Sequence, residues 1–244
     1  MQRNLQRFLD ATAAGVICRL RMHARRAIGA LIALILLFAA AWAAVDEDRM
    51  ERAMASHFGS RGVRSYHAWR ELVSEVKGKS ESEKLVSVNE FFDRRIQFMT
   101  DQENWRQDDY WATPIEALGK GAGDCEDYVI AKYFTLIEAG VDHTRLRWFY
   151  VMATLNYGGR QSTEAHMVLG YYANPSAEPL ILDSLTSVIL PASRRPDLVP
   201  VFSFNSDGIW RQGAVGTTAP TGSVNQLSMW RELMRKMKDE GYEP

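Results

Sequence analysis

The chain has 244 residues, of which 46% are hydrophobic and 11% aromatic, so it can bury a substantial core without disulfides. Its length favours one folded domain or at most two. Lys and Arg total 29 against 30 Asp and Glu, but residues 1–26 hold six Arg and one Asp, which leaves 23 basic and 29 acidic residues from Ala27 onward. This acidic balance and the lack of an RNA- or DNA-binding motif exclude a general nucleic-acid binder.

The N-terminal segment predicts export. Residues 27–45 contain no charged side chain, four arginines precede this run, and the acidic residues 46–48 follow it. A membrane span needs about 20 apolar residues and keeps its basic flank in the cytoplasm, so the run predicts a signal peptide or a membrane anchor. The stretch 41–43 (AWA) favours cleavage, whereas the long leader favours retention, and both stay open. Cys18 precedes the run and receives no role.

The chain is therefore predicted to have two parts: a basic leader plus hydrophobic signal or anchor at 1–45, and an extracytoplasmic folded domain at 46–244. The first fifty or so residues of that domain predict two helices, because their apolar residues recur at helical spacing. The charge-rich stretch 77–84 between the helices is typical of a solvated loop and a helix start. The spaced apolar residues are Trp69, Leu72, Val73 and Val76, then Leu85, Val88, Phe92 and Ile96.

A third helix is predicted from Asp124. Asp124 is a suitable N-cap, Asp127 follows three positions later, and apolar residues continue to Ile137 before Gly140 ends the helix. Cys125 then occupies the first helical position. Its i+4 series consists of apolar and aromatic residues, which places the thiol on the face that packs against a sheet.

The pattern then changes to that of strands. Residues 146–155 are rich in aromatic and β-branched side chains, 166–172 alternate, and 179–190 contain a further apolar run. We expect one antiparallel sheet, with His166 opening a strand near the sheet edge. Residues 212–223 predict a flexible loop, and Leu227, Trp230, Met234 and Met237 predict a terminal amphipathic helix. The predicted fold class is α+β.

Cys125 is the one cysteine beyond the hydrophobic run, and an unpaired thiol in an exported chain indicates a candidate nucleophile. Its thiolate would be favoured by the helix N-terminus and by an imidazolium, for which His166 is placed on a predicted strand. Asp183 ends an apolar stretch and could orient that imidazole. A Cys125, His166 and Asp183 triad is thus one interpretation, with the backbone N–H of Cys125 as an oxyanion donor. An inert cysteine, a strand-edge histidine and a strand-ending aspartate remain the alternative.

Three carboxylates flank the thiol. Asp124, Glu126 and Asp127 oppose its ionisation by like-charge repulsion, which a Ca²⁺ ion bound by their oxygens would offset. The residues alone favour the simpler interpretation, acidic side chains that complement the helix dipole.

Several ordered blocks carry a family resemblance that spans roughly residues 86 to 211. They resemble the bacterial transglutaminase-like cysteine proteinases of the LapG type. The blocks are 109–114 (DYWATP), 121–128 (GAGDCEDY), 165–169 (AHMVL), 179–183 (PLILD) and 195–205 (RPDLVPVFSFN).

The resemblance implies a papain-like or transglutaminase-like fold and a periplasmic, Ca²⁺-dependent cysteine endopeptidase. It assigns Cys125, His166 and Asp183 to the triad, and calcium binding to Asp124, Glu126 and Asp127. Such enzymes clip the N-terminal region of a large repeat-containing surface adhesin and so release cells from a biofilm. An inner-membrane receptor that senses cyclic di-GMP sequesters them.

Two other functions remain open on the sequence. A thioester resolved by an amine instead of water would make the protein a transglutaminase, and other hydrolysis would make it a deamidase. A calcium-dependent periplasmic binding module with a vestigial triad is the non-catalytic alternative.

Overall fold

The computed structural model describes residues 46–211 and 219–242, and residues Glu47–Tyr242 form one compact unit. The predicted leader and hydrophobic run at 1–45, with Cys18, lie outside the described residues, as do residues 212–218 of the predicted flexible loop. Among the helices of the described ranges, none combines the length and apolar character that a membrane crossing requires. The signal or anchor therefore stays a prediction.

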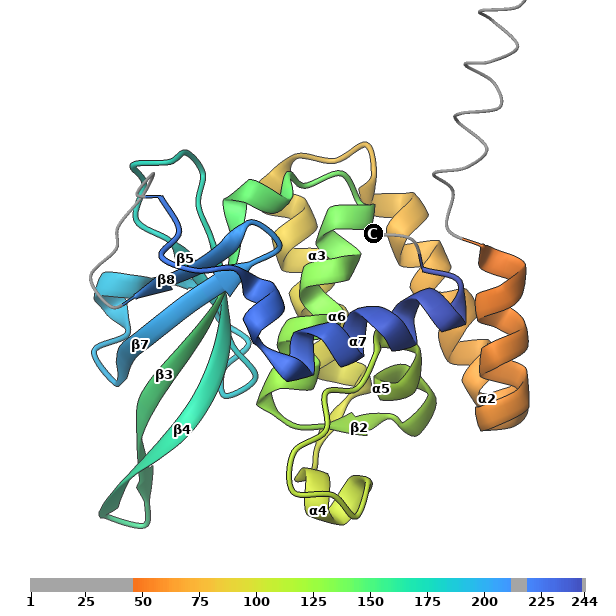
Figure 1. Ribbon diagram of the computed structural model, residues 1–244, viewed down its shortest axis with the longest axis horizontal. Helices are drawn as coiled ribbons and strands as arrows, with labels where there is room; N and C mark the ends of the chain where they lie inside the picture. The colour runs from red at the N-terminus through yellow and green to blue at the C-terminus, as the bar shows by residue number, and fades with distance from the viewer. Residues whose placement is uncertain (1–45, 212–218, 243–244) are drawn as a thin grey trace, which may run out of the picture. The chain divides into compact units, whose positions relative to one another are not determined.

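The helices and the strands of the one larger sheet are largely segregated along the chain, as the α+β prediction requires (Figure 1). The helices are α2 (Glu47–Val76), α3 (Glu81–Arg95), α4 (Asp101–Asn104), α5 (Pro114–Lys120), α6 (Cys125–Glu138) and α7 (Ser228–Glu240), with short 3₁₀ turns η1 (His143–Arg145), η2 (Ala192–Arg194) and η3 (Val224–Gln226). The strands are β1 (Gln97–Phe98), β2 (Ala122–Gly123), β3 (Leu146–Tyr157), β4 (Arg160–Tyr171), β5 (Leu180–Leu182), β6 (Leu190–Pro191), β7 (Leu198–Asn205) and β8 (Gly208–Arg211).

Local signals explain where the N-terminal helices begin and bend. Ser80 caps α3: its hydroxyl accepts the N–H of Glu83, whose carboxylate accepts the N–H of Ser80 in return. Within α2, Gly59 has φ 60° and ψ −156°, a conformation that only glycine adopts readily, and the helix kinks there. The predicted helical lobe is confirmed, and so is the start of the second helix inside the charge-rich stretch.

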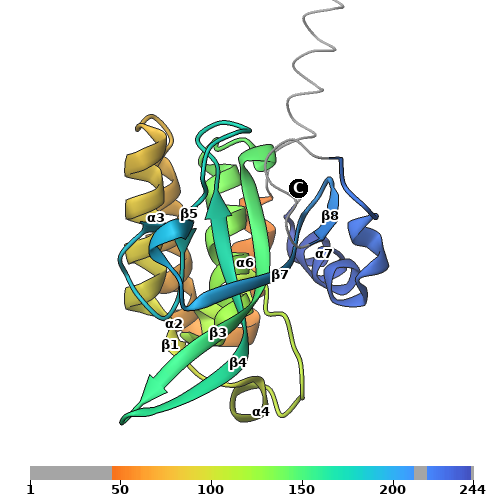
Figure 2. The same cartoon turned by 90° about the vertical axis from the view of Figure 1, so that its left-hand side faces the viewer.

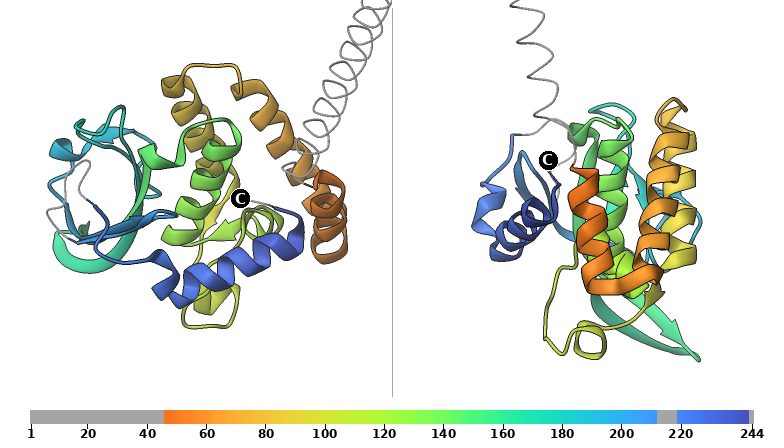
Figure 3. Two further views of the ribbon diagram at one scale, coloured as in Figure 1. Left: turned by 45° about the horizontal axis from the view of Figure 1, so that its top comes forward. Right: turned by 90° about the vertical axis from the view of Figure 1, so that its right-hand side faces the viewer.

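The main sheet has six strands in the order β6-β5-β4-β3-β7-β8, and every neighbouring pair is antiparallel. The helices α2, α3 and α6 lie together to one side of it (Figure 3). The predicted run 179–190 is two short strands, β5 and β6, because residues between them leave the sheet as a loop. A separate parallel pair, β1 with β2, joins the end of α3 to the residue before Asp124.

The expectation that His166 opens a strand is wrong, although among the described residues β4 does have a free edge at this point, because β5 pairs with it only at residues 169–171. Strand β4 already begins at Arg160, and in the sheet it lies between β5 and β3. Every residue from His166 to Tyr171 is buried, so both faces of this half of β4 are covered and no alternation separates them. The polar residues 160–165 that precede His166 belong to a long hairpin that β3 and β4 form beyond the rest of the sheet (Figure 2).

An aromatic cluster joins α6 and α7 to the sheet. The indole of Trp148 on β3 has no solvent exposure and lies at its centre. Burying a large aromatic ring contributes several kcal/mol through removal of apolar surface from water and close packing. The rings in contact with Trp148 belong to Trp111, Tyr133, Phe134, Phe204 and Trp230.

Replacing Trp148 by Ala should lower the free energy of unfolding by about 3–5 kcal/mol, because the cavity would lie between three elements. Trp148→Phe should cost less than about 2 kcal/mol, since it keeps a ring at this position. Denaturant unfolding of both variants measures the difference, and equal losses would contradict a packing role for the indole.

Candidate active site

The start of α6 is held by the carboxylate of Asp127. Its Oδ2 accepts the N–H of Asp124 at 3.3 Å and its Oδ1 accepts the N–H of Ala112 at 2.7 Å. A side chain at Gly123 would place its Cβ 2.6 Å from that carboxylate, so only glycine fits beside it. The predicted helix start at Asp124 and the first helical position of Cys125 are both confirmed.

Cys125 and His166 line the same cleft, which has a volume of about 650 Å³. Asp124 and Glu126 form its acidic wall, and aromatic residues form much of the remainder. These aromatic residues are Phe98, Trp111, Tyr150, Phe202 and Phe204. A cleft of this size that combines aromatic walls with polar groups beside a thiol is typical of a binding or active site.

The thiol of Cys125 is free and partly buried. It donates a hydrogen bond to Oε2 of Glu126 at 2.9 Å. Burial raises its pKa, the negative charges of Glu126 and Asp124 raise it further, and a hydrogen bond from the backbone N–H of Met167 opposes them. The protein residues alone therefore hold this sulfur as a protonated thiol.

His166 and Asp183 form a buried pair. Nε2 of His166 lies 2.7 Å from Oδ1 of Asp183, and only 7% of the imidazole side chain and none of the carboxylate is exposed. Because Nε2 faces the carboxylate, Nδ1 is the ring nitrogen left for another partner. Asp183 follows β5, which pairs with β4 only as far as Leu169, so the carboxylate reaches His166 just past the end of the ladder.

Arg195 holds the other side of this carboxylate. Its Nη2 donates to Oδ2 of Asp183 at 2.7 Å, and its Nε and Nη2 also pair with Asp197. Burial alone would raise the pKa of Asp183, but the hydrogen bonds from His166, the N–H of Leu185 and Arg195 outweigh it and hold the pKa below its ordinary value. Asp183 is thus an anion with a fixed orientation. Sequence reasoning missed Arg195, although this residue opens the block 195–205, which carries part of the family resemblance.

The acidic residues beside the thiol belong to a larger cluster. Asp101, at the start of α4, and Asp109, in the loop that follows, join the three predicted residues, so that ligand atoms of Asp101, Asp124 and Asp127 lie within 4.8 Å of one another. A second set of the same compactness contains Asp101, Asp109 and Glu126. The sequence did not indicate Asp101 or Asp109, because 15 or more residues separate both from Cys125 along the chain.

Two oxygens of the cluster have no hydrogen-bond partner. Oδ1 of Asp101 and Oδ1 of Asp124 are both buried without one. Burial and the neighbouring carboxylates raise the pKa of Asp124 to about 10, and burial is the main cause that raises the pKa of Asp101 to about 6. Closely spaced, partly buried carboxylates with unpaired oxygens fit a hard divalent cation, for which oxygen is the preferred ligand.

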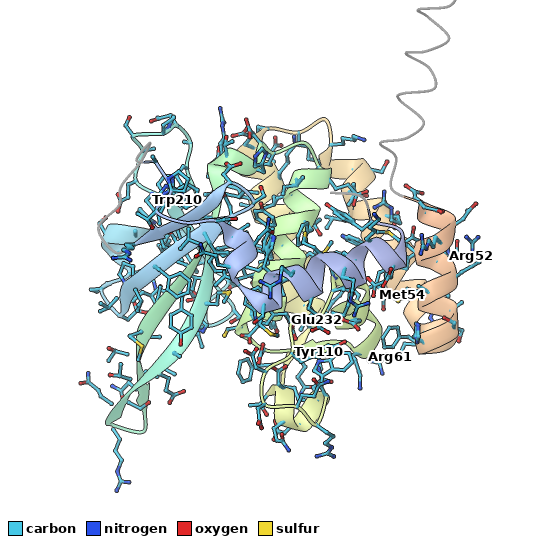
Figure 4. The ribbon with its side chains drawn as sticks, viewed as in Figure 1. Arg52, Met54, Arg61, Tyr110, Trp210 and Glu232 are labelled. Atoms are coloured by element: carbon cyan, nitrogen blue, oxygen red, sulfur yellow. The ribbon has the colours of Figure 1, made fainter. Side chains whose placement is uncertain are left out.

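Helix α7 fixes the loop that carries Asp109. Nζ of Lys236 donates to the backbone oxygen of Trp111 at 2.7 Å and pairs with Glu116 at 2.9 Å. Tyr110 and Glu232, both labelled in Figure 4, line a cavity of about 70 Å³ between this loop and the helix. The C-terminal helix therefore supports one side of the acidic cluster.

Comparison with known proteins identifies the family. Residues 67–197 match the family model described as bacterial transglutaminase-like cysteine proteinase BTLCP. The chain belongs to this family. It is similar to the structure of Legionella pneumophila LapG, with 39% identity and a TM-score of 0.65 over 78% of this chain and 97% of that one. Curated proteins gave no match.

Two further structures of Legionella pneumophila LapG are also similar to this chain. The EGTA-treated form of Legionella pneumophila LapG is 40% identical and the calcium-bound form 39%, each with a TM-score of 0.65. Each match covers 78% of this chain, together with 97% of the EGTA-treated chain and 98% of the calcium-bound chain. The predicted transglutaminase-like cysteine proteinase fold is confirmed.

The raised pKa values of Asp101 and Asp124 make the stability of the folded state depend on pH. Groups whose pKa is higher in the folded state stabilise it at low pH, and this contribution is lost as pH rises through the folded pKa. In chelator, the melting temperature should therefore fall from about pH 5 to about pH 8, because both carboxyl groups are already ionised in the unfolded chain, whereas in the folded state Asp101 keeps its proton up to about pH 6 and Asp124 up to about pH 10. Asp183, whose folded pKa is lowered, changes stability only below this range.

Thermal unfolding with excess Ca²⁺ and with excess chelator checks this prediction. Calcium should raise the melting temperature most at the upper end of the range, because protons no longer compete for the carboxylates. Asp124→Asn should flatten the slope in chelator. A melting temperature that rises with pH in chelator would contradict the assigned repulsion.

Proposed function

We propose that the chain is a calcium-dependent cysteine endopeptidase of the periplasm. The observation that carries the proposal is the cleft shared by Cys125 at a helix start and His166, whose imidazole is bound to a buried carboxylate. Membership of a cysteine proteinase family and likeness to LapG support peptide hydrolysis over other acyl transfer. No feature of the described residues favours the transglutaminase or the non-catalytic alternative.

In the proposed reaction, Sγ of Cys125 attacks the peptide carbonyl and His166 accepts the thiol proton. The imidazolium returns this proton to the leaving amine as the C–N bond breaks, and water then hydrolyses the thioester. Asp183 orients the ring and stabilises its positive form through the 2.7 Å bond to Nε2. The backbone N–H of Cys125, at the positive end of α6, would donate to the oxyanion.

Calcium would be held by Asp124 and Glu126, with Asp101, Asp109 and Asp127 as further donors in the same cluster. When bound, the ion supplies positive charge that offsets the carboxylates beside the thiol. Coordination of the ion by Glu126 would also take away the carboxylate that accepts the hydrogen bond of the Cys125 thiol. The calcium-bound and EGTA-treated forms of LapG support this choice of metal.

The proposed substrate is the N-terminal region of a large repeat-containing surface adhesin, and cleavage would promote biofilm dispersal. The proposed inhibitory partner is an inner-membrane receptor for cyclic di-GMP with a periplasmic domain. Both follow from the resemblance to LapG-type enzymes, and export by the N-terminal segment would bring the enzyme to them.

Incubating the full chain with the N-terminal region of such an adhesin from the same organism tests the function. With Ca²⁺ we expect two fragments and one new N-terminus by mass spectrometry, and with excess chelator or in Cys125→Ala we expect none. Cross-linked products would indicate a transglutaminase instead. Full cleavage in chelator would contradict the calcium role, and full cleavage by Cys125→Ala would contradict the nucleophile.

Substitution of Arg195 should impair turnover through Asp183. Arg195→Met leaves the buried carboxylate with one charged partner fewer, so we expect kcat to fall by at least about tenfold while KM stays within about twofold. Arg195→Lys should recover part of kcat, since it restores the charge without the two-pronged geometry. Steady-state kinetics on the adhesin fragment measures both. Unchanged kcat in Arg195→Met would show that Asp183 needs no such support.

A further inference from the structure

The space alongside β4, on the side away from β3, is filled in three different ways along the strand. At residues 169–171 it is occupied by β5, which pairs with β4 over only three residues. At Met167 it is occupied by the thiol of Cys125, which accepts the backbone N–H. Beside residues 160–165, no strand among the described residues pairs with this edge.

The direction of the backbone groups follows from this geometry. Successive N–H groups of a strand point to opposite sides, so those of Thr163 and Ala165 point the same way as that of Met167. The alternation agrees further along: the N–H of Tyr172 donates to the backbone oxygen of Arg145, which precedes β3, so even-numbered residues of β4 face β3 and odd-numbered ones face away from it. An open row of donors and acceptors therefore leads up to the thiol.

The open edge lacks two of the devices that normally prevent strand addition, proline and a β-bulge, although Arg160 and Glu164 are charged. Residues 160–165 contain no proline, and their pairing with β3 runs without a register shift. Thr163, Glu164 and Ala165 are exposed, directly beside the buried His166. The opposite edge of the hairpin is partly covered, because the N–H of Thr154 on β3 donates to the backbone oxygen of Asp197.

The edge is also continuous with the candidate active site. Ala165, His166 and Met167 line the cleft together with Cys125. Phe98, whose side chain is 56% exposed, lines the same cleft and offers apolar surface to a chain that enters it. A polypeptide paired with residues 161–165 would therefore lead directly to the sulfur of Cys125.

We propose that the substrate binds as an extended strand that pairs with the free edge of β4 over residues 161–165 and delivers its next peptide bond to Cys125. This inference rests on the proposed protease function and specifies its substrate as a segment that is unfolded or easily extended. Main-chain hydrogen bonds would provide affinity, and alternate substrate side chains would face the cleft and the solvent. A peptide bond within a stable helix would not be accepted.

Proline variants of the full chain test the proposal with the adhesin fragment as substrate. Thr163→Pro removes an outward N–H without removing a bond to β3, so we expect KM to rise about tenfold with kcat within about twofold. Asn156→Pro places the same ring on the opposite edge of the hairpin, where the N–H points away from β4 like that of Thr154. It also removes the bond from Gly159 to the Asn156 side chain, and KM should nevertheless stay within about twofold of wild type.

The outcomes separate this inference from the function on which it rests. Unchanged KM in Thr163→Pro, or an equal rise in Asn156→Pro, would overturn strand pairing while leaving the protease intact. No cleavage by the wild-type chain would overturn the proposed function itself. The rate at which iodoacetamide alkylates Cys125 should be the same in all three proteins, which shows an intact site.

A second measurement does not depend on folding of a variant. Peptides that span the mapped cleavage site would be N-methylated at one backbone amide at a time. Loss of kcat/KM at every second position is the expected result, because only alternate amides of a paired strand face its neighbour. A uniform loss or none along the peptide would overturn the proposal.

Discussion

Like-charge repulsion around one thiol is the constraint on which the rest of the site depends. Five carboxylates gather at the start of α6, and the thiol of Cys125 donates a hydrogen bond to one of them. Two unit charges 4 Å apart interact by about 4 kcal/mol at the effective dielectric of a protein surface, so even one ionised neighbour at this distance strongly opposes a thiolate. These carboxylates therefore oppose the activation that a helix N-terminus normally gives a cysteine, and the proposed cation would relieve this opposition.

The fold builds this cluster from segments that are distant along the chain. The short parallel pair β1–β2 brings the end of α3 next to Gly123, and Asp101 follows β1 directly. Helix α7 then holds the loop with Asp109 through Lys236. A small shift of either support would move the proposed ligands of the cation, so metal affinity and stability of the domain should be closely coupled.

On the opposite side of the thiol, the His166–Asp183 pair is rigid and already complete. Arg195 and the N–H of Leu185 occupy the remaining oxygen positions of Asp183, which has no exposed side-chain surface. The two halves of the site thus differ in kind. The imidazole and its carboxylate are preorganised by protein contacts, whereas the state of the nucleophile depends on the acidic cluster and would depend on the cation proposed to bind there.

Local signals in the sequence were enough to predict the start of α6, because capping depends on neighbours such as Asp124 and Asp127. The three carboxylates beside the thiol, and Asp183 directly after β5, were also predictable, because each stands next to a local pattern that the sequence shows. Asp101, Asp109 and Arg195 were not, since only the tertiary fold brings them close. The position of His166 was misjudged because a strand covered on both faces loses its alternation, and its polar first half reads as a turn.

The most direct test of this account is the pKa of the Cys125 thiol with and without calcium. In a full-length chain with Cys18→Ala, Cys125 is the only thiol, and the ultraviolet absorbance of its thiolate can be followed against pH. The account predicts that saturating Ca²⁺ lowers this pKa by about 1–3 units relative to excess chelator. An identical thiol pKa in both conditions would contradict the claim that the cation activates the nucleophile by offsetting its acidic neighbours.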